Sequence, residues 1–230
     1  MDAKYSGIKR ACRIDSLIFF EVLIGLREGK FKTEKSISLF ILKRFRKLGL
    51  MKAFPPIVAN NCAEIHAKPR NKKLAHGFLV LDFGVRYRGM ASDFTRTIFL
   101  GKASAEERKL YNLILKCQKE CVKRAKIGAD CKGLDALARK KLGKYARYFT
   151  HALGHGVGRR IHMRPRISPK SKEILLEGQF ITIEPGIYLK RSRGRKEFGI
   201  RIEDTLFIGK KTEVLTRAPR RLIEVEANFK

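Results

Sequence analysis

Five side chains of the types that bind metal ions lie far apart in the sequence, each within a short apolar or glycine-flanked segment. They are the carboxylates of Asp82, Asp93, Glu184 and Glu203 and the imidazole of His155. The segments have the composition of β-strands, and a carboxylate inside a buried strand needs a charged or hydrogen-bonding partner. The fold must therefore bring distant strands together around these groups.

The first two carboxylates lie on consecutive predicted strands. Asp82 interrupts one β-branched and aromatic run, and Asp93 lies near the start of the next. The polar, glycine-containing segment 85–90 between them predicts a chain reversal. A turn centred near Tyr87 and Arg88 would place Asp93 opposite Asp82, with Cβ atoms roughly 4.5–5.5 Å apart. Two carboxylates at that distance repel each other, and divalent ions between them would remove the repulsion.

A similar arrangement recurs near the C-terminus. Residues 179–184 and 199–208 are both strand-like, each carries one of the two glutamates, and a longer basic loop separates them. His155 lies in the glycine-rich segment 151–158, where small residues let another backbone approach and keep the imidazole accessible. Each of the five residues has an ordinary explanation when it is considered alone, as a satisfied polar group, a solvated strand edge or a turn histidine. Together they predict a metal site, and imidazole with carboxylates suits Zn, Mn, Fe or Co.

Helical periodicity and a capping signature predict the helices of the chain. Apolar residues at helical spacing predict helices over 10–27 and 33–48, before the first strand pair. A capping-box signature at Ser104 opens a predicted helix that reaches residue 125, and a shorter one covers 133–142. The chain therefore has a weak internal repeat of two α–β–β halves. This repeat predicts an α+β fold in which both carboxylate pairs meet at the centre of a curved antiparallel sheet, with helices outside.

The residues around these side chains resemble the motifs of a known family, the pita-bread metallopeptidases (M24). The family includes Xaa-Pro aminopeptidases, prolidases and methionine aminopeptidases. The matching segments are Asp82-Phe-Gly, Ser92-Asp93-Phe-Thr-Arg-Thr, Gly154-His155-Gly-Val-Gly, Ile183-Glu184-Pro-Gly-Ile-Tyr and Gly199-Ile-Arg-Ile-Glu203-Asp. The resemblance runs from about residue 7 to about residue 223 and implies the pseudo-two-fold pita-bread fold. It also implies one catalytic domain over residues 1–230 without a separate N-terminal domain, although the length also allows two small domains.

The family's ligand pattern implies two divalent ions, which would be Mn, Co, Zn or Fe. Asp82 would hold one ion, His155 and Glu184 the other, and Asp93 and Glu203 would bridge both. Glu184 would in addition accept or relay a proton during catalysis.

Further residues resemble active-site positions of the Xaa-Pro aminopeptidase and prolidase branch. His66, His151 and His162 fall where that branch has additional histidines. By this resemblance His66 and His162 would hydrogen-bond the substrate and the tetrahedral intermediate, and His151 would shape the side that accepts proline. Arg201 would orient an acidic metal ligand through a charge-assisted hydrogen bond. Ala152 and Met163 depart from the usual pattern, which puts the shape of the substrate pocket in doubt.

The resemblance implies an aminopeptidase that removes the first residue of a peptide, with proline preferred in second place. Methionine aminopeptidase is the first alternative, although in those enzymes the last glutamate usually follows a Gln-Phe pair, whereas Arg201-Ile precedes Glu203 here. A protein of the same fold with little or no activity that binds nucleic acid is the alternative from another class.

Composition adds a strong positive charge. Lys and Arg number 52 against 22 acidic residues, a formal net charge of +30, which favours non-specific association with polyanions. The densest basic run, residues 190–196, is predicted to be a solvated hairpin tip. The five cysteines form no CxxC pair, and neither a signal peptide nor a run of about 18 apolar residues is present. We therefore expect a cytoplasmic protein that does not enter a membrane, with a homodimer as a further possibility.

Overall fold

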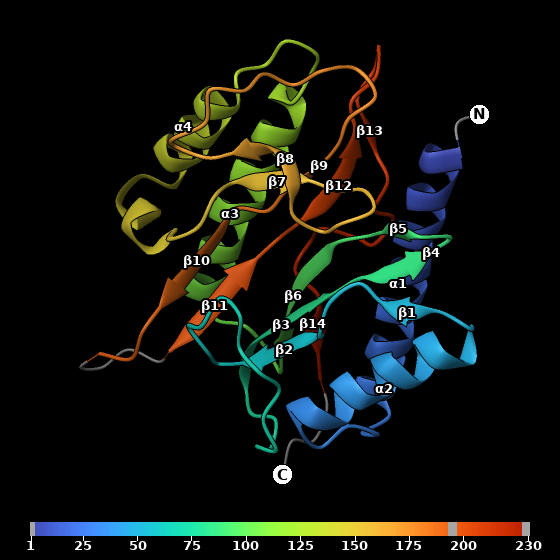
Figure 1. Cartoon of the computed structure of the whole chain (residues 1–230). Helices are drawn as coiled ribbons and strands as arrows, with labels where there is room; N and C mark the ends of the chain where they lie inside the picture. Colours follow the sequence, from blue (N-terminus) through green and yellow to red (C-terminus); the bar gives the residue numbers. More distant parts are fainter. Residues whose placement is uncertain (1–2, 193–196, 227–230) are drawn as a thin grey trace.

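The computed structural model describes residues 3–192 and 197–226. The chain runs through two halves, each of which begins with two helices and continues into strands (Figure 1). The first half contains α1 (Ala3–Arg27), α2 (Glu34–Lys47), β1 (Met51–Lys52), β2 (Ile57–Asn60), β3 (Gly77–Phe83), β4 (Val85–Tyr87), β5 (Met90–Ala91) and β6 (Phe94–Leu100). The second half contains α3 (Ala105–Arg124), α4 (Cys131–Leu142), a 3₁₀ helix (Gly143–Tyr148), β7 (Gly154–Gly156), β8 (Met163–Ile167), β9 (Phe180–Ile183), β10 (Gly186–Leu189), β11 (Phe198–Arg201), β12 (Asp204–Phe207), β13 (Glu213–Val214) and β14 (Glu224–Val225).

The predicted helices are confirmed, with shifts at their starts. Thr33 and Ser104 cap α2 and α3 through reciprocal capping boxes, which satisfy backbone N–H groups of the first turn. Helix α1 begins at Ala3 rather than at residue 10, because Ile8 and its neighbours also pack into the core. Helix α4 begins at Cys131, where the side chain of Asp130 accepts hydrogen bonds from the first turn.

Two larger sheets carry the site. One has the order β14-β6-β3-β2 and the other β13-β12-β9-β7-β8, while β1-β4-β5 and β10-β11 form two small sheets. Helices α1 and α2 pack on the first half in one apolar cluster, and α3 and α4 pack on the second half in another. The α+β class and the two-half plan are confirmed, and hydrogen bonding divides the strands among several sheets that meet at β6 (Figure 1).

The predicted pairing of Asp82 with Asp93 is wrong by two residues. Asp82 pairs with Thr95, because the turn is centred on Arg88 and Gly89. Both central residues have positive φ, 49° for Arg88 and 76° for Gly89, which is the conformation of a tight hairpin turn that matches strand twist. A shift of two residues keeps both aspartates on the same face of the sheet. The carboxylates are therefore diagonal neighbours rather than direct partners.

The second carboxylate pair forms as expected. Strand β9 pairs with β12 in antiparallel register, with Ile183 opposite Asp204. Glu184 follows the end of β9 and Glu203 precedes the start of β12, so the same register places the two glutamates opposite each other. The basic run at 190–196 begins at the end of β10, and its residues 193–196 lie outside the described residues.

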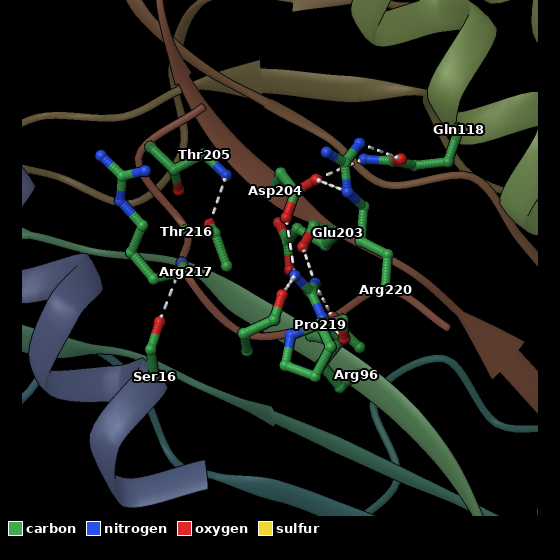
Figure 2. A network of polar contacts seen from close by, with 12 residues as sticks. Ser16, Arg96, Gln118, Glu203, Asp204, Thr205, Thr216, Arg217, Pro219 and Arg220 are labelled. Atoms are coloured by element: carbon green, nitrogen blue, oxygen red, sulfur yellow. Dashed lines mark hydrogen bonds and ion pairs between the residues drawn. The ribbon is translucent and has the colours of Figure 1, made fainter. Parts of the chain in front are cut away.

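Side chains of β6 connect the two halves. Thr97 Oγ1 donates to the carbonyl of Arg201 at 2.9 Å and accepts from its N–H at 3.0 Å, and the N–H of Glu203 donates to the carbonyl of Thr95 at 3.2 Å. Arg96 lies beside them, 1% exposed, and donates to Asp204 Oδ1 at 2.7 Å. Figure 2 shows its further bonds to the carbonyls of Glu203 and Pro219. These contacts hold the Glu203 segment against the strand that follows Asp93.

No helix in the described ranges is long and apolar enough to cross a bilayer. All five cysteines are buried and none forms a disulfide.

The buried carboxyl group of Asp15 on α1 makes the stability of the fold depend on pH. It is fully buried, and neither carboxylate oxygen has a hydrogen-bond partner among the described residues. Burial raises its pKa well above the usual value, so folding favours the protonated form. A raised folded-state pKa gives stability that is present at acid pH and is lost as the pH rises through that pKa.

We expect Asp15→Asn to stabilise the protein at neutral pH, by on the order of 1–3 kcal/mol, because an amide enters the core without the free-energy cost of protonating a carboxylate on folding. Asparagine is nearly isosteric and has a similar helix propensity. Thermal unfolding of both proteins between pH 4 and 8 measures the effect, and the advantage should shrink toward pH 4. Glu177→Gln, at an exposed position, is the control. A variant no more stable than wild type at pH 8 would contradict the assignment.

Candidate metal centre

His155 occupies a strand whose neighbours press closely against it. A Cβ atom on Gly154 would lie 2.0 Å from the carbonyl oxygen of Thr182, and one on Gly156 would lie 2.1 Å from that of Arg164. Glycine is therefore required on both sides of the histidine, as its small neighbours suggested. His155 Nδ1 lies 3.1 Å from the carbonyl of Gly156, so Nδ1 donates and Nε2 is left as an acceptor facing the carboxylates.

The structure brings four of the five predicted ligands together. His155 Nε2 lies 3.5 Å from Asp93 Oδ2 and 3.4 Å from Glu184 Oε1. Asp93, His155 and Glu203 each offer a ligand atom within 4.8 Å of the others. These residues come from both halves of the chain, which is why no local stretch of sequence contains the whole site.

Asp82 is held by Arg201. The Arg201 guanidinium donates to Asp82 Oδ2, and its Nε donates to Thr95 Oγ1 at 3.2 Å. Thr95 in turn donates to Glu203 Oε2 at 2.6 Å. Arg201 therefore makes a charge-assisted bond to an acidic side chain. Asp82 from the first half and Glu203 from the second are thus connected through two side chains.

Burial and mutual repulsion raise the pKa values of the acidic groups. Burial raises the pKa of Glu184 to about 7. Burial and the neighbouring carboxylates raise the pKa of Asp93 and Glu203 well above the usual values. Burial lowers the pKa of His155 to about 4, so its imidazole is neutral near pH 7. A neutral imidazole beside clustered carboxylates has the electronic state of a metal ligand.

Two buried oxygens support the presence of a cation. Asp82 Oδ1 and Glu203 Oε1 have no hydrogen-bond partner within the described ranges, although each is almost inaccessible to water. Buried charged oxygens are normally paired or bound to a metal. The second oxygen of each carboxylate is bonded to Arg201 or Thr95, so the unpaired oxygen is the one available to an ion. The donor set fits one or more divalent ions.

The three additional histidines surround this centre. His162 makes an edge-to-face contact with His155, with ring centroids 4.5 Å apart. His66 is exposed, and its charge opposes the rise in the pKa of Asp82 that burial causes, as does that of His162. His151 Nε2 lies 3.2 Å from the hydroxyl of Tyr188. All three lie in the same region as the carboxylates.

Sequence patterns missed three residues that shape the site. Tyr188 lies between His151 and Arg201, and its hydroxyl contacts both. Thr95 joins Glu203 to Arg201, and Thr182 accepts from the N–H of His155 at 3.1 Å. A signal existed for Tyr188 and Thr95, since both lie inside the motifs around Glu184 and Asp93. Their roles depend on cross-strand contacts, which a local pattern does not contain.

This cluster of carboxylates and an imidazole, with buried oxygens that have no partner among the described residues, defines a candidate site for divalent metal ions. Residues 6–210 match the model of metallopeptidase family M24. The chain belongs to this family.

Similar proteins with known names lie within the same family. A Xaa-Pro dipeptidase of Pyrococcus horikoshii is 37% identical over 223 residues, covering 94% of this chain and 62% of that protein. The crystal structure of a prolidase from Thermococcus sibiricus superposes with a TM-score of 0.89 at 36% identity, covering 96% of this chain and 60% of the other. An X-Pro aminopeptidase from Thermotoga maritima gives 0.88 at 34% identity, with 98% and 64% covered. The chain spans about three fifths of the length of these relatives.

The unpaired oxygens predict strong stabilisation by divalent ions. After chelation, adding Mn²⁺ or Co²⁺ at roughly 100 times its dissociation constant should stabilise the fold by about 2.7 kcal/mol, which is on the order of 5–10 °C in Tm. Differential scanning calorimetry measures this gain, and elemental analysis gives the ion stoichiometry. Asp93→Asn should lose most of the gain, whereas Glu177→Gln should keep it. An equal gain in Asp93→Asn would remove that residue from the ligand set.

Proposed function

We propose that the chain is the catalytic domain of a dinuclear-metal aminopeptidase that removes the first residue from peptides whose second residue is proline. The carrying observation is the clustering of Asp93, Glu184 and Glu203 around His155, with buried oxygens of Asp82 and Glu203 that have no partner among the described residues. The M24 family and relatives named Xaa-Pro dipeptidase, prolidase and X-Pro aminopeptidase support a prolyl substrate. Asp82 would hold one ion, His155 and Glu184 the other, and Asp93 and Glu203 both.

The ions, when bound, would polarise the scissile carbonyl and make water at the centre more acidic. Glu184, whose pKa burial raises to about 7, is suited to accept a proton from the attacking water and pass it to the leaving amine. His162 and His66 would hydrogen-bond the substrate carbonyl as negative charge develops on its oxygen. His151 is held by Tyr188 and contributes to the side that accepts proline.

Manganese or cobalt are the ions we would test first, with zinc and iron as the other candidates. The buried, unpaired cysteines suit a reducing compartment such as the cytoplasm. A homodimer and non-specific association with polyanions stay predictions.

Substrate preference distinguishes the proposed Xaa-Pro aminopeptidase activity from methionine aminopeptidase and dipeptidase activity. With each of Mn²⁺, Co²⁺, Zn²⁺ and Fe²⁺, the protein should release alanine from Ala-Pro-Ala faster than methionine from Met-Ala-Ser. Chromatography of the released amino acids measures both rates. Ala-Pro as a third substrate distinguishes dipeptidase from aminopeptidase action. Preferential methionine release would sink the prolyl assignment. The nucleic-acid alternative would be favoured if the purified protein holds no divalent metal, cleaves no peptide with any of the four ions, and binds RNA tightly at physiological salt.

Glu184→Gln tests the proton-transfer role, because the amide keeps a ligand oxygen but no longer accepts a proton. Hydrolysis should fall by about 10²–10⁴-fold while the metal is retained, as measured by kcat and elemental analysis. Glu177→Gln is the control for the loss of one carboxylate. Near wild-type hydrolysis by Glu184→Gln would exclude the assigned role.

A further inference from the structure

The loop that connects β2 and β3 carries His66. Strand β2 ends at Asn60 and β3 begins at Gly77, and the two strands pair directly. Residues 61–76, which we call the His66 loop, contain no helix and no strand beyond a single isolated bridge. Paired antiparallel strands are commonly joined by about two to five residues, and much longer loops are usually functional or disordered. His66 therefore keeps a fixed place only if side chains elsewhere in the fold hold this loop.

The buried carboxylate of Glu34 holds the loop at two places. Glu34 is the first residue of α2 and is 1% exposed. Its Oε1 accepts from the N–H of Asn60 at 2.9 Å and from Arg70 Nη2 at 2.6 Å. Its Oε2 accepts from the N–H of Arg70 at 2.8 Å and from Arg70 Nε at 2.9 Å. One carboxylate thus joins the residue before the loop to a residue inside it, and His66 lies between the two.

Arg70 adds contacts to this clamp, which we define as Glu34, Asn60 and Arg70. Arg70 Nη2 also donates to the carbonyl of Asn60 at 3.1 Å, and the carbonyl of Arg70 accepts from the N–H of Lys35 at 3.1 Å. Further along the loop, the N–H of Ala75 donates to Asn60 Oδ1 at 2.7 Å. A bidentate arginine–carboxylate pair is stronger and more directional than hydrogen bonds between neutral groups. The loop is therefore held against α2 and the end of β2.

The segment around His66 lies against the metal centre. Arg201, which donates to Asp82, also donates through Nη1 to the carbonyl of Ile65 at 3.4 Å. Ile65 directly precedes His66 in the chain. Burial lowers the pKa of His162, and the charge of His66 adds to the effect. In the described part of the chain, no side chain of the clamp bonds to a predicted metal ligand, so the clamp reaches the centre only through the loop.

We propose that Glu34 and Arg70 are positioning residues, which place His66 against the substrate by holding the loop that carries it. The inference rests on the peptidase function proposed above. Holding a group in its productive geometry avoids the entropy cost of ordering it during the reaction, and a displacement of about 1 Å can reduce a rate about 10²-fold. The clamp orders the loop when the protein folds, so the binding of substrate does not have to.

Arg70→Gln tests the clamp, because glutamine lacks the charge and the paired donors of arginine. With Ala-Pro-Ala and metal-loaded protein, kcat/KM should fall about 10- to 100-fold, while elemental analysis finds the same ion content. His66→Ala should lower kcat/KM at least as much. In the double variant, Arg70→Gln should have little further effect, since both changes remove the same positioned imidazole. A role limited to stability would lower kcat/KM by the same factor with and without His66.

Arg44→Gln is the matched control. Arg44 Nε and Nη2 donate to the two carboxylate oxygens of Glu21 at 2.5 and 2.6 Å, a paired arginine–glutamate contact between α2 and α1. Its loss should leave kcat/KM within about twofold of wild type, because the His66 loop keeps its clamp. Arg70→Lys is the conservative variant, since it keeps the charge opposite Glu34 but not the paired donors. Its kcat/KM should lie between those of wild type and Arg70→Gln.

Hydrogen exchange followed by mass spectrometry tests the clamp without turnover. The backbone N–H groups of residues 61–76 should exchange at least about tenfold faster in Arg70→Gln and at the wild-type rate in Arg44→Gln. If wild type cleaves no peptide with any of the four ions, the peptidase function fails, whereas faster exchange in Arg70→Gln still confirms that the clamp holds the loop. The positioning proposal fails alone if peptides are cleaved but Arg70→Gln matches wild type in loop exchange or in kcat/KM. It also fails if Arg70→Gln lowers kcat/KM equally with and without His66.

Discussion

Repulsion among four buried carboxylates is the constraint on which the rest of this structure depends. Asp82, Asp93 and Glu203 are buried and Glu184 is mostly buried, and the charges of neighbouring carboxylates help to raise the pKa of Asp93 and Glu203. Among the described residues, the buried cation bonded to one of these carboxylates is Arg201, whose guanidinium contacts Asp82 and neutral oxygens of threonine and tyrosine. One guanidinium does not balance four carboxylates. Divalent ions of the type the donor set accepts would supply the remaining positive charge.

Concentrating carboxylates at the junction of two halves also requires that the halves be held together. Arg96 holds the two halves together without a metal, because its guanidinium is buried and donates to Asp204 and to the carbonyls of Glu203 and Pro219. Asp204 also accepts from Gln118 at 2.7 Å, so the ion pair has its remaining oxygen satisfied (Figure 2). Removing one member of such a buried pair typically costs about 3–5 kcal/mol. The pair therefore fixes Glu203 relative to β6 independently of any metal.

Local sequence patterns predict the elements and motifs of the site better than they predict its geometry. The capping box at Ser104 and the strand-like runs depend on neighbours within a few positions, and these predictions agree with the structure. The assignment of the metal ligands stays a prediction. The register between Asp82 and Asp93 did not follow, because moving the turn centre by one residue, from Tyr87–Arg88 to Arg88–Gly89, moves the pairing by two. Contacts made across sheets, such as those of Tyr188, depend on the assembled fold. The carboxylate oxygens of Asp15 are buried without a hydrogen-bond partner among the described residues, and this results from how α1 packs against the rest of the fold. The sequence of α1 alone does not predict it.

Arginines at this site differ in what their surroundings allow them to do. Arg201 is buried and its donors are committed to protein oxygens, so engaging a substrate would require breaking bonds that hold Asp82. Arg166 is exposed, and its guanidinium has no bonded partner in the described part of the chain. The high net charge acts at longer range and raises the encounter rate with anions without selecting among them. The buried Arg201 therefore fixes the geometry of the centre through its bond to Asp82, whereas exposed arginines such as Arg166 add to the general positive potential around it.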